Sequence, residues 1–253
     1  MSLPVAGLVL GLLFSSPLWA SGEDPLHSPM WNFHQARLLG DAPYQFDERV
    51  KVISPPFAED ARQVPITVDA RALGADVVKV VAWAELNPIA HLFTFTPTGA
   101  VAPRLAINIR VEQATPLRAA ALTRDGVWHV GSTRIEAAGG GCTAPGATRS
   151  QPGWEERLGH ISGARFPLNK GEQGSRLRLK ISHPMDNGLS SGVPEFFIEF
   201  AELRDASGAV LARLELQPSV SENPSLTLQL GDEQPGQQLW LRDNNGNTFT
   251  ATL

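Results

Sequence analysis

Apolar and polar residues alternate along short segments in both halves of the chain. Within 106–112, positions 107, 109 and 111 are isoleucine or valine with polar residues between them, and residues 176–181 alternate arginine or lysine with leucine or isoleucine. A period of two is typical of a β-strand with one face in a core and one in water. Further short segments rich in β-branched residues lie at 64–68, 77–83, 91–95, 117–123 and 128–135, and then at 196–203, 210–216, 226–230, 238–241 and 248–252. The pattern predicts an all-β protein.

The predicted strands form two series, separated by residues 139–154, where the alternation stops. Each series spans about 95 residues, close to the roughly 100 of an immunoglobulin-like domain. We therefore expect two immunoglobulin-like β-sandwich domains, at 46–138 and 155–253, joined by a glycine-rich cysteine arm and linker at 139–154. Four tryptophans are expected in the sandwich cores, namely Trp83, Trp128, Trp154 and Trp240.

The first 45 residues precede the first predicted sandwich. Residues 1–20 carry no charged side chain, have an apolar core at 5–14 and end in the small residue Ala20, which predicts a secretory signal peptide and a periplasmic protein. The apolar core is too short to span a bilayer. Residues 21–45 are expected to form an N-terminal clasp segment, with a short helix at 31–39.

The net charge and the cysteine count narrow the function. The chain has 21 basic and 26 acidic residues, a net charge of −5 without basic runs, which argues against nucleic-acid binding. Cys142 is the only cysteine, so in an oxidising compartment it can form only an intermolecular disulfide or another covalent adduct.

Three glycines, Gly139, Gly140 and Gly141, directly precede Cys142. Because glycine reaches backbone conformations that are closed to other residues, this run predicts a mobile hinge that presents an exposed, reactive thiol. One alternative is a small buried thiol, since free cysteine is often buried. Another is a surface thiol without a role. The glycines, Thr143 and Pro145 around Cys142 favour the exposed interpretation.

The sequence offers no pattern for catalysis or for a resident cofactor. His183 and Met185 suit Cu(I), but two residues are too few, and no Cys-x-x-Cys or His-x-x-x-His pattern completes a metal site. A Gly-x-Ser-x-Gly elbow is absent, and the glycine run lacks the lysine of a phosphate loop. His183, Pro184 and Met185 are instead expected to shape a loop that packs between the two domains.

The residues resemble a known pair of protein families. Residues 137–142, which follow a β-domain, resemble the carboxyl-terminal arm of SoxY, the sulfur-carrier subunit of bacterial thiosulfate oxidation, with its Gly-Gly-Cys core. Residues 181–188, 221–224 and 239–246 resemble stretches of its partner SoxZ. The resemblance covers roughly residues 50–253, and is greatest to fused SoxYZ-like carriers of the type associated with quinoprotein dehydrogenases.

This resemblance implies a periplasmic carrier that is not an enzyme. A sulfur-containing cargo would ride covalently on Cys142, and periplasmic oxidoreductases or c-type cytochromes would load and unload it. In SoxY the cysteine lies at the free end of the chain, whereas here Thr143 continues into the second domain, so the arm is tethered at both ends. The alternative is a non-catalytic binding or assembly module for a periplasmic quinoprotein dehydrogenase, in which the thiol is incidental.

Overall fold

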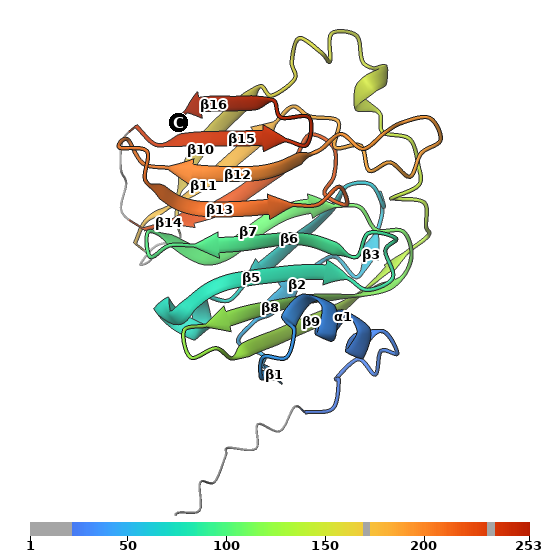
Figure 1. Cartoon of the computed structure of the whole chain (residues 1–253), viewed down its shortest axis with the longest axis vertical. Helices are drawn as coiled ribbons and strands as arrows, with labels where there is room; N and C mark the ends of the chain where they lie inside the picture. The colour runs from blue at the N-terminus through green and yellow to red at the C-terminus, as the bar shows by residue number, and fades with distance from the viewer. Residues whose placement is uncertain (1–21, 169–172, 232–235) are drawn as a thin grey trace, which may run out of the picture.

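Two β-sheets make up most of the fold (Figure 1). The computed structural model describes residues 22–168, 173–231 and 236–253, so the predicted signal peptide at 1–20 lies outside the described residues. Besides strands, the described ranges contain one α-helix, α1 (Trp31–Leu39), and two 3-10 helices, η1 (Arg71–Asp76) and η2 (Thr148–Ser150). No helix in these ranges is long and apolar enough to cross a membrane.

The first and the last strand along the chain lie at opposite edges of the larger sheet. In the described residues this sheet runs β1 (Tyr44–Phe46), β9 (Trp128–Ala137), β8 (Thr115–Thr123), β5 (Val77–Ala84), β6 (His91–Pro97), β13 (Val210–Leu216), β12 (Ile198–Arg204), β15 (Gln238–Asp243), β16 (Thr248–Thr252), with β3 (Phe57–Ala58) paired to β9. The smaller sheet runs β10 (Ile161–Pro167), β11 (Ser175–Ile181), β14 (Ser225–Leu230), β7 (Val101–Ile109), β4 (Val64–Asp69), β2 (Lys51–Ile53).

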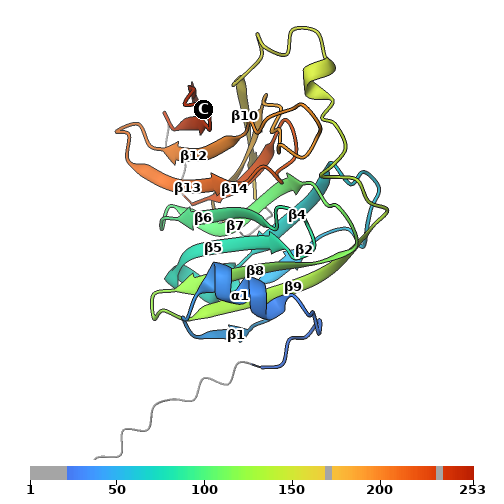
Figure 2. The ribbon, with the colours of Figure 1, turned by 45° about the vertical axis from the view of Figure 1, so that its right-hand side comes forward.

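Both sheets continue through both halves of the chain, as Figure 2 shows where β6 lies beside β13 and β7 beside β14. In the larger sheet Phe95 pairs with Leu214, and in the smaller sheet Leu105 pairs with Leu228. All four side chains are buried in one continuous core. The two halves are therefore connected by strand pairing in both sheets, as well as by the chain segment around Cys142.

The period-two pattern in the sequence corresponds to inward and outward faces. In β11 the leucines and the isoleucine face the core, while Arg176, Arg178 and Lys180 are exposed. The predicted segment at 106–112 is offset from its strand, because β7 begins at Val101 and ends at Ile109. Residues 110–112 therefore lie beyond the strand end, although they continue its alternation.

The N-terminal segment packs on the outer face of the larger sheet (Figures 1 and 2). Trp31 of α1 stacks on Trp83 of β5 with 6.1 Å between ring centroids. The fully buried Arg118 lies 2.8 Å from the Glu85 carboxylate and 2.7 Å from that of Asp24. A buried ion-pair network and an aromatic cluster thus attach this segment to the sheet.

Two of the four tryptophans expected in the cores are only half-buried. Trp154 and Trp240 lie under arginine side chains, with the guanidinium carbon of Arg149 4.7 Å from the Trp154 ring centre and that of Arg204 4.6 Å from the Trp240 ring centre. These contacts are typical of surface cation–π pairs, so the core assignment of both rings is wrong.

Candidate functional site

Cys142 lies in the segment of residues 138–147 that joins β9 to η2, which we call the cysteine loop. The Glu112 carboxylate accepts hydrogen bonds from the backbone N of Cys142 (2.9 Å), the backbone N of Thr143 (3.2 Å) and the Thr143 hydroxyl (3.0 Å). The Glu112 carbonyl also accepts one from the backbone N of Gly140 at 3.1 Å. Residue 112, just beyond the end of β7, therefore holds the loop against the first half of the chain.

The second half of the chain holds the same loop from its other side. The Asn187 side-chain amide donates to the carbonyl of Cys142 at 2.7 Å. The Glu222 carboxylate accepts from the backbone N of Ala147 (3.1 Å), the backbone N of Thr148 (2.8 Å) and the Thr148 hydroxyl (2.6 Å). Both halves thus contribute to the position of the thiol.

The expectation of an exposed thiol on a mobile tether is wrong for this conformation, because Cys142 is 0% exposed. Burial and, to a lesser extent, the Glu112 carboxylate raise the pKa of the Cys142 thiol to about 12, while the Arg110 guanidinium acts in the opposite direction. The sulfur is therefore protonated at neutral pH. Since the thiolate is the nucleophile, the closed loop protects Cys142 from reaction.

The glycines before Cys142 fit a tight turn. Gly139 (φ 110°) and Gly140 (φ 81°) adopt positive φ angles, which favour glycine. A Cβ on Gly141 would lie 2.1 Å from the carbonyl oxygen of Ala61 and 2.4 Å from that of Val111. The run therefore allows a close backbone approach in the closed state, and its role as a hinge stays a prediction.

Pro184 and Met185 contact the first half of the chain, whereas the polar contacts of His183 are with the second half. The Arg110 guanidinium donates to the carbonyl oxygens of Met185 (3.1 Å) and Pro184 (3.4 Å). His183 Nδ1 accepts from the backbone N of Met185 at 3.1 Å, and its Nε2 lies 3.8 Å from the Asp243 carboxylate, beyond hydrogen-bond distance. Burial lowers the pKa of His183 to about 4, so the ring is neutral at neutral pH.

The His183 ring and the Met185 sulfur, the two groups that suit Cu(I), each accept a hydrogen bond from a backbone N–H group. The Met185 sulfur accepts a hydrogen bond from the backbone N of Ile198 at 3.3 Å, and His183 Nδ1 is engaged by Met185. In the part of the chain that the structure describes, no three His, Cys, Asp or Glu residues lie where they could hold a metal ion. Both side chains are used by the fold around them.

Four residues of this site were not singled out from the sequence, namely Arg110, Glu112, Asn187 and Glu222. Arg110 and Glu112 continue the alternation of β7, which suggested a water-facing position. Asn187 and Glu222 do fall within the SoxZ-like stretches at 181–188 and 221–224, and this overlap was the available signal. The contact of Asn187 with the cysteine loop spans 45 residues of the chain, and that of Glu222 with Ala147 spans 75. Local sequence patterns do not encode contacts of this range.

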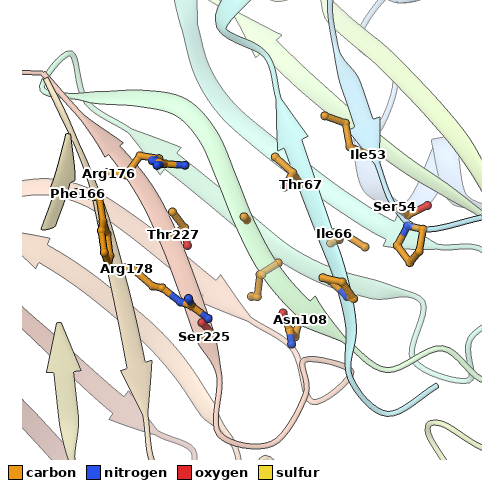
Figure 3. A pocket seen from close by; sticks show the side chains of 14 residues that line it. Ile53, Ser54, Ile66, Thr67, Asn108, Phe166, Arg176, Arg178, Ser225 and Thr227 are labelled. Carbon is orange, nitrogen blue, oxygen red and sulfur yellow. The ribbon is translucent and has the colours of Figure 1, made fainter. Parts of the chain in front are cut away.

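Of two hollows on the described surface, only the smaller one adjoins the site. One of about 690 Å³ lies on the outer face of the smaller sheet, and Figure 3 shows Arg176 and Arg178 on one side of it and Ile53 on the other. Its lining includes no residue of the cysteine loop. The other, of about 330 Å³, is lined by Pro145 of the cysteine loop and by Arg110, among others. We call it the loop cavity.

Each half of the chain matches the model of a different protein family. Residues 35–142 match the family model "Sulfur oxidation protein SoxY", and residues 168–253 match "Sulphur oxidation protein SoxZ". The chain is thus a fusion of a SoxY domain and a SoxZ domain, two sulfur-oxidation carrier families that are non-catalytic. The SoxY match ends at Cys142.

The similar solved structures are distant. The sulfur carrier protein SoxY from Chlorobium limicola f thiosulfatophilum is 16% identical over 43% of this chain and 96% of that chain, with a TM-score of 0.39. A glycosyl hydrolase family 2 member from Bacteroides cellulosilyticus (13% identity, 77% of this chain and 24% of that chain, TM-score 0.23) and a beta-glycosidase from Bacteroides vulgatus (11%, 82% and 25%, 0.24) also match. No curated protein sequence matches significantly.

Proposed function

We propose that the protein is a periplasmic carrier that holds a sulfur-containing cargo covalently on Cys142 and presents it to partner enzymes. The observation that carries this proposal is the SoxY match over residues 35–142, which ends on the only cysteine of the chain. The SoxZ half supports it, because Asn187 and Glu222 bond the loop that carries the thiol.

Carrier function requires the cysteine loop to open. In the closed loop the sulfur is fully buried and its pKa is about 12, so neither loading nor transfer proceeds from this conformation. Opening would break the three hydrogen bonds to the Glu112 carboxylate and rotate the chain about Gly139, Gly140 and Gly141. Because the loop is held at both ends, we expect it to reach a shallow docking site rather than a deep channel.

We infer the compartment and the partners from the same two families. Sox proteins are typically periplasmic, which agrees with the signal peptide predicted at 1–20. We infer that periplasmic oxidoreductases or c-type cytochromes load and unload Cys142. An association with a quinoprotein dehydrogenase belongs to this proposal and rests on the sequence resemblance.

Intact-mass measurement of the protein isolated from its native host without reductant tests the carrier proposal. We expect added mass on the wild type, such as sulfane sulfur, a sulfonate joined to the cysteine sulfur by an S–S bond, or a thiol disulfide, which reductant removes. Cys142→Ser should carry none of it. A wild-type chain with an unmodified thiol that also resists alkylation in the folded state would falsify the carrier function.

A second candidate is a binding or assembly module for a periplasmic dehydrogenase. The buried, protonated thiol favours it, because a structural cysteine has the same environment. The two candidates differ in the behaviour of Cys142→Ser. A carrier loses its function while the fold stays intact, whereas an assembly module keeps its affinity for the partner.

A further inference from the structure

The smaller sheet carries an excess of positive charge, although the protein as a whole is acidic. Asp69 is the only acidic residue in its strands, all of which the structure describes, and its carboxylate pairs with Arg71 at 2.8 Å and Arg104 at 3.3 Å. The basic residues of the same strands are Lys51, Arg104, Arg165, Arg176, Arg178 and Lys180. The whole chain has a net charge of −5, so this sheet is opposite in charge to the rest of the molecule.

Three of these cations form a ladder along the outer face of β11. Arg176, Arg178 and Lys180 alternate with core residues and are exposed. Successive members lie about 7 Å apart, because side chains on one face of a strand are two residues apart. None of the three has an ion-pair partner among the described residues. The ladder is therefore a row of cations that these residues do not neutralise.

The ladder borders the larger of the two hollows, which we call the sheet hollow. Its volume of about 690 Å³ is in the range of ligand-binding sites. Figure 3 shows Arg176, Arg178 and Phe166 on one side of it and Ile53 on the other. No acidic residue of the described ranges lines it. Both halves of the chain contribute, because β11 and β14 belong to the second half and β4 and β7 to the first.

Small side chains form the floor of the sheet hollow. Ala106 of β7 pairs with Thr67 of β4 on one side and with Thr227 of β14 on the other. Arg178 continues this row at one end and Ile53 at the other. The strands β11 and β4 are three strand spacings apart, about 14 Å, which admits one extended chain between them. The hollow is thus a groove with one cationic wall and one apolar wall.

An extended peptide matches both walls at once. Its side chains alternate between two sides, with the same repeat of about 7 Å as the ladder. A segment that lies along β14 and β7 directs every second side chain toward Arg176 and Arg178 and the others toward Ile53. Carboxylates suit the first wall, because a guanidinium group binds a carboxylate through two parallel hydrogen bonds. Apolar side chains suit the second.

The sheet hollow also lies beside residues that hold the cysteine loop. Asn108, which lines the hollow, donates to the Gln63 side chain at 3.2 Å, and Gln63 donates to the carbonyl of Glu222 at 3.1 Å. The Glu222 carboxylate in turn accepts from the backbone N of Thr148 at 2.8 Å. This position favours a protein as the occupant over a small ligand, because a protein in the hollow is large enough to contact the loop as well.

We propose that the sheet hollow is a docking groove for an extended segment of a partner protein in which acidic and apolar side chains alternate. Arg176 and Arg178 bind the carboxylates, and Ile53 packs against the apolar side chains. The groove contains no residue of the cysteine loop. The proposal therefore goes beyond the carrier function and is tested independently of it.

A synthetic hexapeptide of alternating glutamate and valine, blocked at both ends and carrying a fluorescent label, tests the groove on the full chain. Fluorescence anisotropy measures its affinity. A peptide with lysine in place of glutamate reverses the charge, and one with three glutamates followed by three valines keeps the composition without the alternation. We expect the alternating acidic peptide to bind about tenfold or more tighter than the lysine peptide, and several-fold tighter than the block peptide. Added salt should weaken it.

Two pairs of substitutions separate the groove from the net charge. Arg176→Glu with Arg178→Glu should weaken binding of the alternating peptide by about tenfold or more, because each exposed ion pair contributes about two- to fivefold and the reversal adds repulsion. Arg124→Glu with Arg134→Glu makes the same change in net charge outside the sheet hollow and should leave the affinity nearly unchanged. Thr227→Tyr fills the floor with an outward-facing ring and no new charge, and should abolish binding.

Each other outcome overturns the docking groove. No binding to the wild type, or equal affinity for the alternating and block peptides, would leave only a charged surface. Binding that persists in a folded Thr227→Tyr would place the peptide elsewhere, such as on the edge strand β10. If Thr227→Tyr does not fold, the two arginine pairs decide, and equal losses in both contradict the groove. A dimer of the chain alone that only Arg176→Glu with Arg178→Glu dissociates would assign this face to a second copy. The mass test on Cys142 is unaffected by all of these results.

Discussion

At the scale of single residues, Cys142 is a thiol whose environment suppresses its own chemistry. Its pKa of about 12 means that the closed loop favours the protonated sulfur. The preference for the protonated sulfur stabilises the closed loop. This stabilisation is fully present below about pH 9, the pKa range of an ordinary thiol, and is lost as the pH rises through about 12. Reaction of the thiol near neutral pH therefore requires an open loop.

This argument predicts the pH profile of Cys142 alkylation in the folded protein. If iodoacetamide reacts only with the open loop, the rate should keep rising with pH beyond about 8.5, the pKa of an exposed thiol, because ionisation of the thiol also increases the open fraction. It should lie well below the rate of the unfolded chain, which levels off at about pH 8.5. Stopped-time alkylation read by intact mass from pH 6 to 11 measures it. A rate that levels off at about pH 8.5, as in the unfolded chain, would mean that Cys142 is already exposed in the native state.

Glu112→Ala provides the matched variant for the same profile. The loop loses three hydrogen bonds to a carboxylate, so the rate should rise by about tenfold or more near neutral pH, and the pH at which the rate levels off should move down toward the pKa of an exposed thiol. Glu136→Ala removes an exposed carboxylate elsewhere and should change nothing. An unchanged rate in Glu112→Ala would show that Glu112 does not keep the loop closed.

The sequence identified the thiol but not its surroundings. Cys142 stands out because it is the only cysteine, and the glycines beside it mark a special backbone. Glycine serves both a mobile tether and a tight turn, so the sequence does not distinguish the two. The tight turn is formed because Gly141 packs against the backbone of Ala61 and Val111, and because the Glu112 carboxylate binds the loop. These three residues are distant from the loop along the chain.

At the scale of elements, the cysteine loop depends on the missing side chain of Gly141. Gly141→Ala should destabilise the protein by about 1–3 kcal/mol, because the new Cβ would overlap two backbone carbonyls that belong to the fold. Urea unfolding followed by circular dichroism measures the loss. Gly99→Ala, where nothing lies within 4 Å, is the control and should cost far less. Equal effects would show that the closed loop is not packed as described.

Strands were predictable where one face is exposed to solvent and the other is buried in the core. The segments at 210–216 and 248–252 coincide with β13 and β16, and the helix at 31–39 coincides with α1. The strands β1, β2 and β3 have three residues or fewer, too short to show a period. The strand β10 was missed because it is an edge strand without a buried face, so its residues do not alternate.

At the scale of the whole molecule, the strand pairing between the halves is the feature that local patterns could not supply. Two separate series of strands are visible in the sequence, but nothing in them states that β6 pairs with β13 or β7 with β14. This strand pairing also determines the geometry around Cys142. Because the halves share two sheets, Asn187 and Glu222 of the second half are fixed relative to Glu112 of the first, and the cysteine loop lies between these fixed groups.

Shared sheets predict that the two halves stay together after the chain is cut. A protease site inserted at the exposed residues 151–152 allows cleavage after folding. The two fragments should elute together at the mass of the intact protein and separate only in denaturant, because parting them would expose the paired strands and core residues such as Phe95 and Leu214. The uncut insertion variant is the control, and calorimetry should give one cooperative transition. Fragments that elute separately with intact β-sheet spectra, or two transitions in the uncut chain, would mean that each half folds alone and that the pairing at β6–β13 and β7–β14 contributes little to stability.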